Sequence, residues 1–91
     1  MKSLPDHVVH YKTTPEFNQD SVPAGLLRDH ATAAGVWGRI VVREGGLRYV
    51  IDGPASEKHL LGPGTPGIVE PQVLHHVVAE GPVRFCVEFY R

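Results

Sequence analysis

The sequence has a single cysteine, Cys86, among its 91 residues. One thiol cannot form an internal disulfide, which excludes the small secreted proteins that disulfides hold together. No apolar run approaches the ~18–20 residues that a membrane span requires, and residues 1–6 contain no apolar segment typical of a secretory signal. We therefore expect a soluble, cytoplasmic protein.

The sequence also lacks a surplus of charge of either sign. Nine Lys and Arg residues stand against ten Asp and Glu residues, for a net charge of -1. Nucleic-acid-binding proteins normally carry a basic surplus, so we expect no nucleic-acid partner, and no membrane partner either. The length fits one domain, residues 1–91, with an N-terminal arm over about residues 1–22.

Windows long enough for a helix are few, because ten Gly and eight Pro are spread along the chain. A helix needs about 10–12 uninterrupted residues, whereas turn residues between short apolar stretches are typical of sandwiches and barrels. The sequence therefore predicts an all-β fold.

Alternation of apolar and polar side chains locates the strands. We expect strands at residues 37–43, 47–52, 57–61, 68–69, 74–79 and 83–90, and an edge strand at residues 7–11. Glu44-Gly45-Gly46 is predicted to be the tight turn of a hairpin, because glycine supplies the positive φ of a short reversal. In the last strand Val83, Phe85, Val87 and Phe89 share the face expected in the core.

Six histidines raise the question of a binding site. Glu70 and Gln72 are two residues apart, so an extended chain would aim both to the same side, and His75 follows at the start of the next strand. A carboxylate, an amide and an imidazole beside a proline bend can form half of a metal site. The alternative is a capped turn with one histidine at the edge of the core.

His30 is the second imidazole candidate, since in an antiparallel barrel it could meet His75 from a neighbouring strand. Cys86 lies mid-strand and is better explained as a structural thiol than as a nucleophile. Residues 62–67 are rich in glycine but lack the Lys-Ser/Thr of a phosphate-binding loop, and we interpret them as a rigid turn.

The spacing around His75 resembles the second motif of the cupins. Gly64, Glu70, Gln72 and His75 keep its intervals, although Glu70 and Gln72 replace the usual proline and glycine. His30 resembles the first motif, in which Thr32 stands where a second histidine is usual.

Six blocks in order are similar to a narrower group, the TehB-like tellurite-resistance cupin family. They are residues 23–27, Asp29-His30, and residues 35–39, 46–49, 68–72 and 88–90. The resemblance implies a small cupin-like double-sheet (jelly-roll) barrel over residues 1–91. The methyltransferase that follows this module in some relatives is absent here, so we expect no S-adenosylmethionine chemistry.

Two functions from different classes remain open. The first is a metal-binding cupin with one divalent ion (Zn, Fe or Ni) held by His30, His75 and Glu70 or Gln72, capable of non-haem oxygenase-type chemistry. The second is a non-catalytic stress-response module that binds a small molecule or an oxyanion.

Trp37 and Arg39 are candidates for lining the pocket in either case. Trp37 could equally pack in the core, and Arg39 could be a solvated surface charge. The apolar Val8-Val9 pair and Tyr11 offer a sheet edge through which we expect a homodimer.

Overall fold

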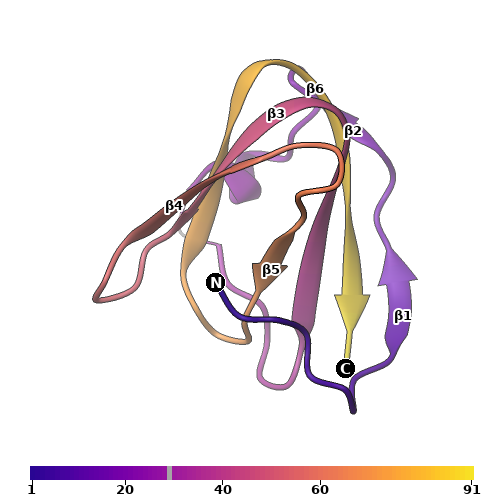
Figure 1. Ribbon diagram of the computed structural model, residues 1–91, viewed down its shortest axis with the longest axis vertical. Helices are drawn as coiled ribbons and strands as arrows, with labels where there is room; N and C mark the ends of the chain where they lie inside the picture. The colour runs from indigo at the N-terminus through magenta and orange to yellow at the C-terminus, as the bar shows by residue number, and fades with distance from the viewer. Residues whose placement is uncertain (29) are drawn as a thin grey trace.

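The computed structural model describes residues 1–28 and 30–91; Asp29, which belongs to one block of the family resemblance, lies outside the described residues. These residues form six strands and one short 3₁₀ helix, arranged as in Figure 1. They are β1 (His10–Thr13), β2 (Phe17–Asn18), η1 (Ala24–Leu27), β3 (Trp37–Ile51), β4 (Glu57–Leu61), β5 (Gly67–Val69) and β6 (His75–Tyr90). The predicted all-β fold is confirmed. No helix in the described part of the chain has the length and apolar character to cross a membrane.

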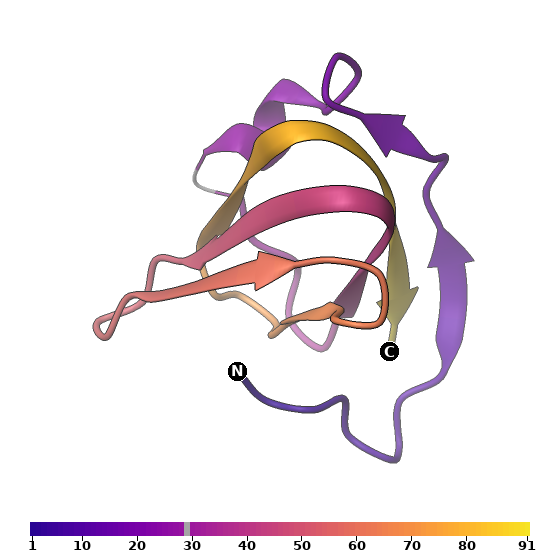
Figure 2. The same cartoon turned by 45° about the horizontal axis from the view of Figure 1, so that its top comes forward.

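The strands form one antiparallel sheet in the order β1-β6-β3-β4, with β2 paired to β6 and β5 paired to β3. Both long strands arch in Figure 2, so the sheet curls around its apolar face. The first half of β3 pairs with β5 and the second half with β4, while β6 pairs with both halves. The coiled sheet remains open, because β1 and β4 are its two ends.

The predicted hairpin at Glu44-Gly45-Gly46 is wrong. Strand β3 continues through these residues, and its pairing with β6 shifts register between Val42 and Glu44 and again between Gly45 and Leu47. Gly45 has φ +81°, and a Cβ at this position would collide with the carbonyl oxygen of Pro82 on β6. The glycine therefore bends a continuous strand at a bulge, where the close partner strand leaves no room for a side chain.

The apolar faces of the two halves of the sheet meet in one core. Its buried members are Ile40, Val42, Leu47, Tyr49, Leu61, Val69, Val77, Val83, Phe85 and Val87. The inward face predicted for the last strand is confirmed, with Phe89 partly buried against the same cluster. Cys86 is buried on the opposite face, where Nη2 of Arg43 lies 3.8 Å from its sulfur.

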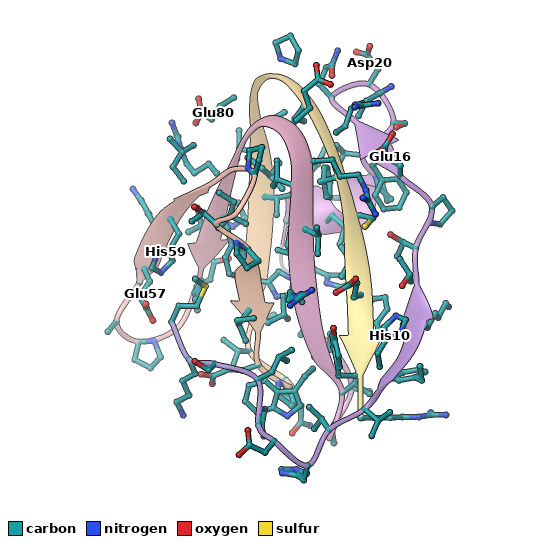
Figure 3. The ribbon with its side chains drawn as sticks, turned by 45° about the vertical axis from the view of Figure 1, so that its right-hand side comes forward. His10, Glu16, Asp20, Glu57, His59 and Glu80 are labelled. Atoms are coloured by element: carbon teal, nitrogen blue, oxygen red, sulfur yellow. The ribbon has the colours of Figure 1, made fainter. Side chains whose placement is uncertain are left out.

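Charged side chains lie outside this core. Figure 3 shows His59 and Glu57 together on β4, and Nε2 of His59 lies 3.1 Å from Oε1 of Glu57. On another side Glu16 lies near both Arg43 and Arg84, at 3.7 Å and 3.9 Å. Exposed ion pairs of this kind contribute little to stability.

Candidate functional site

His30 and His75 meet although 45 residues separate them. Their backbones form a two-residue bridge, in which the amide of each donates to the carbonyl of the other at 2.9 Å and 2.8 Å. Nδ1 of His30 lies 3.2 Å from Nε2 of His75, and the two rings are nearly perpendicular with centroids 5.0 Å apart. The structure thus brings together the two imidazoles that the sequence singled out.

Contacts with the core fix the position of the His75 side chain. Its side chain is buried, its Nδ1 lies 3.2 Å from the carbonyl oxygen of Val73, and its ring stands edge-on to that of Tyr49 at 5.7 Å. The hydroxyl of Tyr49 donates to the carbonyl of Ile68 at 2.9 Å. Burial lowers the pKa of His75 and raises that of Tyr49, because both charged forms lose their hydration.

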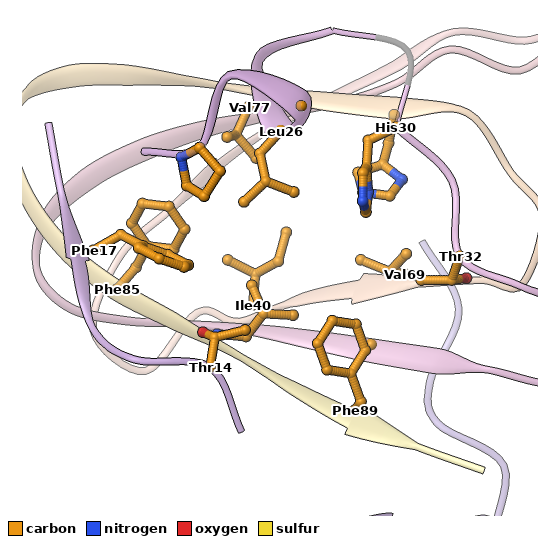
Figure 4. Close-up of a pocket in the computed structure, with 15 residues that line it drawn as sticks. Thr14, Phe17, Leu26, His30, Thr32, Ile40, Val69, Val77, Phe85 and Phe89 are labelled. Carbon is orange, nitrogen blue, oxygen red and sulfur yellow. The ribbon is translucent and has the colours of Figure 1, made fainter. Parts of the chain in front are cut away.

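The histidine pair forms part of the wall of a cavity of about 250 Å³ between the two halves of the sheet. In Figure 4 Phe17 and Phe85 close one end and His30 stands at the other, with Leu26 and Ile40 between them. The remaining lining residues are Thr14, Pro23, Gly25, Thr32, Gly38, Val69, His75, Val77, Val87 and Phe89. Apart from the two imidazoles and two threonine hydroxyls, the lining side chains are apolar.

A second, more open hollow adjoins the cavity. It is lined by Tyr11, Lys12, His30, Ala31, Thr32, Ala33, Val36 and Phe89. His30, Thr32 and Phe89 belong to both linings. These three side chains therefore stand between the half-open cavity and the more open hollow.

Glu70 and Gln72 do not join the histidines. Neither residue lines the cavity, and Oε1 of Glu70 lies 3.7 Å from Nζ of Lys2 instead. Gln72 is exposed, has φ +62°, and donates its backbone N–H to the carbonyl of Thr32 at 3.0 Å. The left-handed residue turns the chain, so the alternation that would have aimed both side chains toward His75 does not apply.

Trp37 and Arg39 lie on the other face of β3. Gly38 and Ile40 line the cavity, and strand alternation points the residues beside them outward. Nε of Arg39 forms a 2.9 Å ion pair with Oε1 of Glu88, its partner on β6. This placement gives no support to a pocket-lining role for either residue.

Sequence reasoning missed the part of the wall that comes from the N-terminal arm. Thr14 and Phe17 of the arm line the cavity together with Leu26 of η1, yet all three lie before the strands whose alternation is clear. Phe17 packs its ring against that of Phe85 at 5.6 Å. The phenylalanine at position 17 is a local indication in the sequence that the arm is fixed to the core.

Comparison with known proteins identifies a family. The model of the TehB-like domain matches residues 12–87 of this chain. Haemophilus influenzae TehB, named "Probable S-adenosyl-L-methionine-dependent methyltransferase TehB", is 29% identical over 84% of this chain, which covers 28% of TehB. Escherichia coli K12 YeaR, named as uncharacterized, is 28% identical, and the match covers 99% of this chain and 83% of YeaR.

Solved structures agree on the fold. A crystal structure of an Escherichia coli K12 protein, 24% identical, superposes with a TM-score of 0.87 and covers 100% of this chain and 97% of that one. The crystal structure of Haemophilus influenzae TehB, 27% identical, has a TM-score of 0.83 and covers 93% of this chain and 32% of that one. This chain therefore spans less than a third of the TehB proteins that it matches.

The expected metal-binding cupin is wrong. Across residues 1–28 and 30–91 no three His, Cys, Asp or Glu side chains gather in a way that could hold a metal ion. The relatives whose names state an activity are methyltransferases. The predicted Zn, Fe or Ni ion and the oxygenase-type chemistry are both overturned, since Glu70 and Gln72 supply no oxygen ligand beside His30 and His75.

Proposed function

Since the chain belongs to the TehB-like domain family, we propose that it is a non-catalytic binding domain that takes a small organic molecule into the cavity beside His30 and His75. One observation carries this proposal. The curled sheet encloses a cavity with apolar walls and a few converging polar groups, the composition typical of ligand sites.

The size of the cavity limits the ligand. Its volume of about 250 Å³ lies just below the ~300–1,000 Å³ usual for pockets that hold drug-sized molecules. An engineered apolar cavity of about 150 Å³ holds benzene. A single ring with a few further atoms is therefore the class of molecule that fits.

The lining favours a neutral ligand over an oxyanion. No lysine or arginine lines the cavity among the described residues, and an anion buried without a paired charge is costly. Lys12 lies only in the adjoining open hollow. Arg39, the charged residue that the sequence offered as a pocket-lining candidate, is paired with Glu88 on the outer face.

Methyl transfer from S-adenosylmethionine is a second candidate function, which the name of TehB favours. This chain matches only 28% of TehB, and the cavity is small for a whole cofactor of that size. Calorimetric titration with S-adenosylmethionine distinguishes the two candidates, because saturable binding would favour methyl transfer over the proposed binding domain.

Toluene is the probe for the proposed function. We expect it to bind one-to-one, with chemical-shift changes confined to residues around the cavity. Leu26→Trp should abolish binding, because the larger side chain enters the cavity from η1. Leu27→Trp is the matched control, since Leu27 is the next residue of the same helix and is 47% exposed. Failure of both toluene and phenol to bind the parent protein would refute the proposal.

Two finer features of the molecule also remain proposals. A cupin-like, double-layered barrel within one domain is supported by the bends of β3 and β6, which place each strand in both halves of the sheet. A homodimer is supported by β1 at one end of the sheet and by Val9, which is 68% exposed. Light scattering of the parent and Val9→Glu proteins tests the dimer, and a monomeric parent would refute it.

A further inference from the structure

The hydrogen bonds of the histidine pair have a direction. A carbonyl oxygen can only accept, so the contact between Val73 and His75 places the proton of His75 on Nδ1. In the neutral ring Nε2 of His75 is then an acceptor. Nδ1 of His30, at 3.2 Å, must be the donor to it.

Within the described residues, this direction leaves Nε2 of His30 without a proton and without a hydrogen-bond partner. Neutral His30, with its proton on Nδ1, has a lone pair on Nε2. Within the described residues no hydrogen-bond partner of this Nε2 occurs, and no unpartnered polar side-chain atom there is fully buried. The Nε2 atom is therefore reachable, on a residue that lines both the cavity and the open hollow.

Both threonine hydroxyls that line the cavity already donate a hydrogen bond to a backbone carbonyl. Oγ1 of Thr14 donates to the carbonyl of Pro15 at 2.9 Å and accepts from the amide of Val87 at 3.0 Å. Oγ1 of Thr32 donates to the carbonyl of Val36 at 2.7 Å. Among the described residues, the polar side chains around the cavity thus offer acceptors and no free donor, which suits a ligand that donates a hydrogen bond.

From this pattern we propose that the cavity selects a small neutral aromatic alcohol or phenol, whose hydroxyl donates to Nε2 of His30. The inference rests on the proposed binding function and names its ligand class. The rings of Phe17, Phe85 and Phe89 line the same space and provide faces for an aromatic body. A ketone, an ether or an oxyanion of the same size brings only acceptors and finds no side-chain donor.

Phenol, anisole and toluene test the inference, because they share one ring and differ in the donor. One hydrogen bond is worth ~1 kcal/mol net, so phenol should bind the parent protein about five-fold more tightly than anisole or toluene. ¹⁵N spectra of the histidine rings should show Nε2 of His30 unprotonated, and phenol but not toluene should shift its resonance.

Variants test whether the His30–His75 pair causes the preference for phenol over toluene. In His30→Phe/His75→Leu phenol should lose its advantage and bind more weakly than toluene, because both imidazole acceptors are gone and the phenol hydroxyl is buried without a partner. His76→Gln is the control, since His76 is bonded to Asp52 at 2.7 Å and does not line the cavity; it should keep the preference.

The outcomes separate the inference from the function on which it rests. Failure of toluene and phenol alike to bind the parent protein overturns the binding function itself. Equal affinities in the parent protein, or a protonated Nε2 on His30, overturn the ligand class and leave the binding function standing. The measurements on the parent protein decide the matter even if the double variant does not fold.

Discussion

At the scale of single residues, His75 combines a polar ring with a buried position. It is 4% exposed, and its two ring nitrogens face Val73 and His30. Buried polar groups are destabilising unless they are hydrogen-bonded, and the pairing of both nitrogens meets that requirement. The same burial disfavours the protonated ring.

This burial predicts how stability depends on pH. The folded-state pKa of His75 is lowered from 6.5, first by burial and also by the neighbouring His30. As the pH falls below about 6.5, the unfolded chain binds a proton at this position before the folded protein does, so stability is lost. Above that pH this contribution to stability is fully present.

Thermal unfolding at pH 7.5 and pH 5.5 measures the effect. The melting temperature of the parent protein should fall more over this interval than that of His75→Gln, which has no ring to protonate. His59→Gln serves as the control, because His59 is paired with Glu57 on the surface, and it should follow the parent. Equal decreases in the parent and His75→Gln would show that His75 is not responsible.

At the scale of elements, the bend in β3 is what folds the sheet over its own core. The two register shifts lie on either side of Glu44-Gly45, and Gly45 is paired with Val83 of β6. Because β3 and β6 bend together, the half that carries Ile40 faces the half that carries Val77. The cavity exists between these two faces.

We therefore expect Gly45→Ala to destabilise the protein by at least ~2 kcal/mol. A left-handed backbone alone disfavours alanine by ~1–2 kcal/mol, and here the added methyl group also meets the Pro82 carbonyl. Urea unfolding monitored by circular dichroism measures the loss.

Two other glycines separate the cost of the left-handed backbone from the cost of the contact with Pro82. Gly81 has the same φ of +81° but open space around it, so Gly81→Ala should show only the backbone cost. Gly53 has open space and no positive φ, and Gly53→Ala should be close to neutral. Similar losses in all three variants would contradict the role assigned to the contact with Pro82.

At the scale of the whole molecule, the two long strands make the halves of the sheet dependent on each other. Strands β3 and β6 pair over both halves, and the N-terminal arm closes the cavity through Phe17. If one half unfolds, the other half loses the apolar side chains that face it in the shared core.

The protein should therefore unfold in one cooperative transition. Trp37, the only tryptophan, lies at the start of β3 and its fluorescence monitors one half, whereas far-UV circular dichroism monitors the whole sheet. Both probes should give the same urea midpoint, as a two-state domain requires. Two separated midpoints would mean that the halves are independent units.

Local patterns in the sequence were enough to determine the strand class and the inward faces. Alternation is a property of each extended segment, so Val83, Phe85 and Val87 could be assigned to the core without knowing their partners. The spacing of glycine and proline likewise excluded long helices. The TehB-like blocks in the sequence identified the family correctly.

The tertiary structure alone decided the turn, the cavity and the composition of the site. Whether Gly45 reverses or bends the chain depends on Pro82, which is distant in sequence and contacts it only in the folded sheet. Gln72 leaves the extended conformation, so the alternation that would have placed it with His75 no longer holds. His30 meets His75 only because antiparallel pairing joins segments 45 residues apart. A local sequence pattern cannot indicate a contact over that separation.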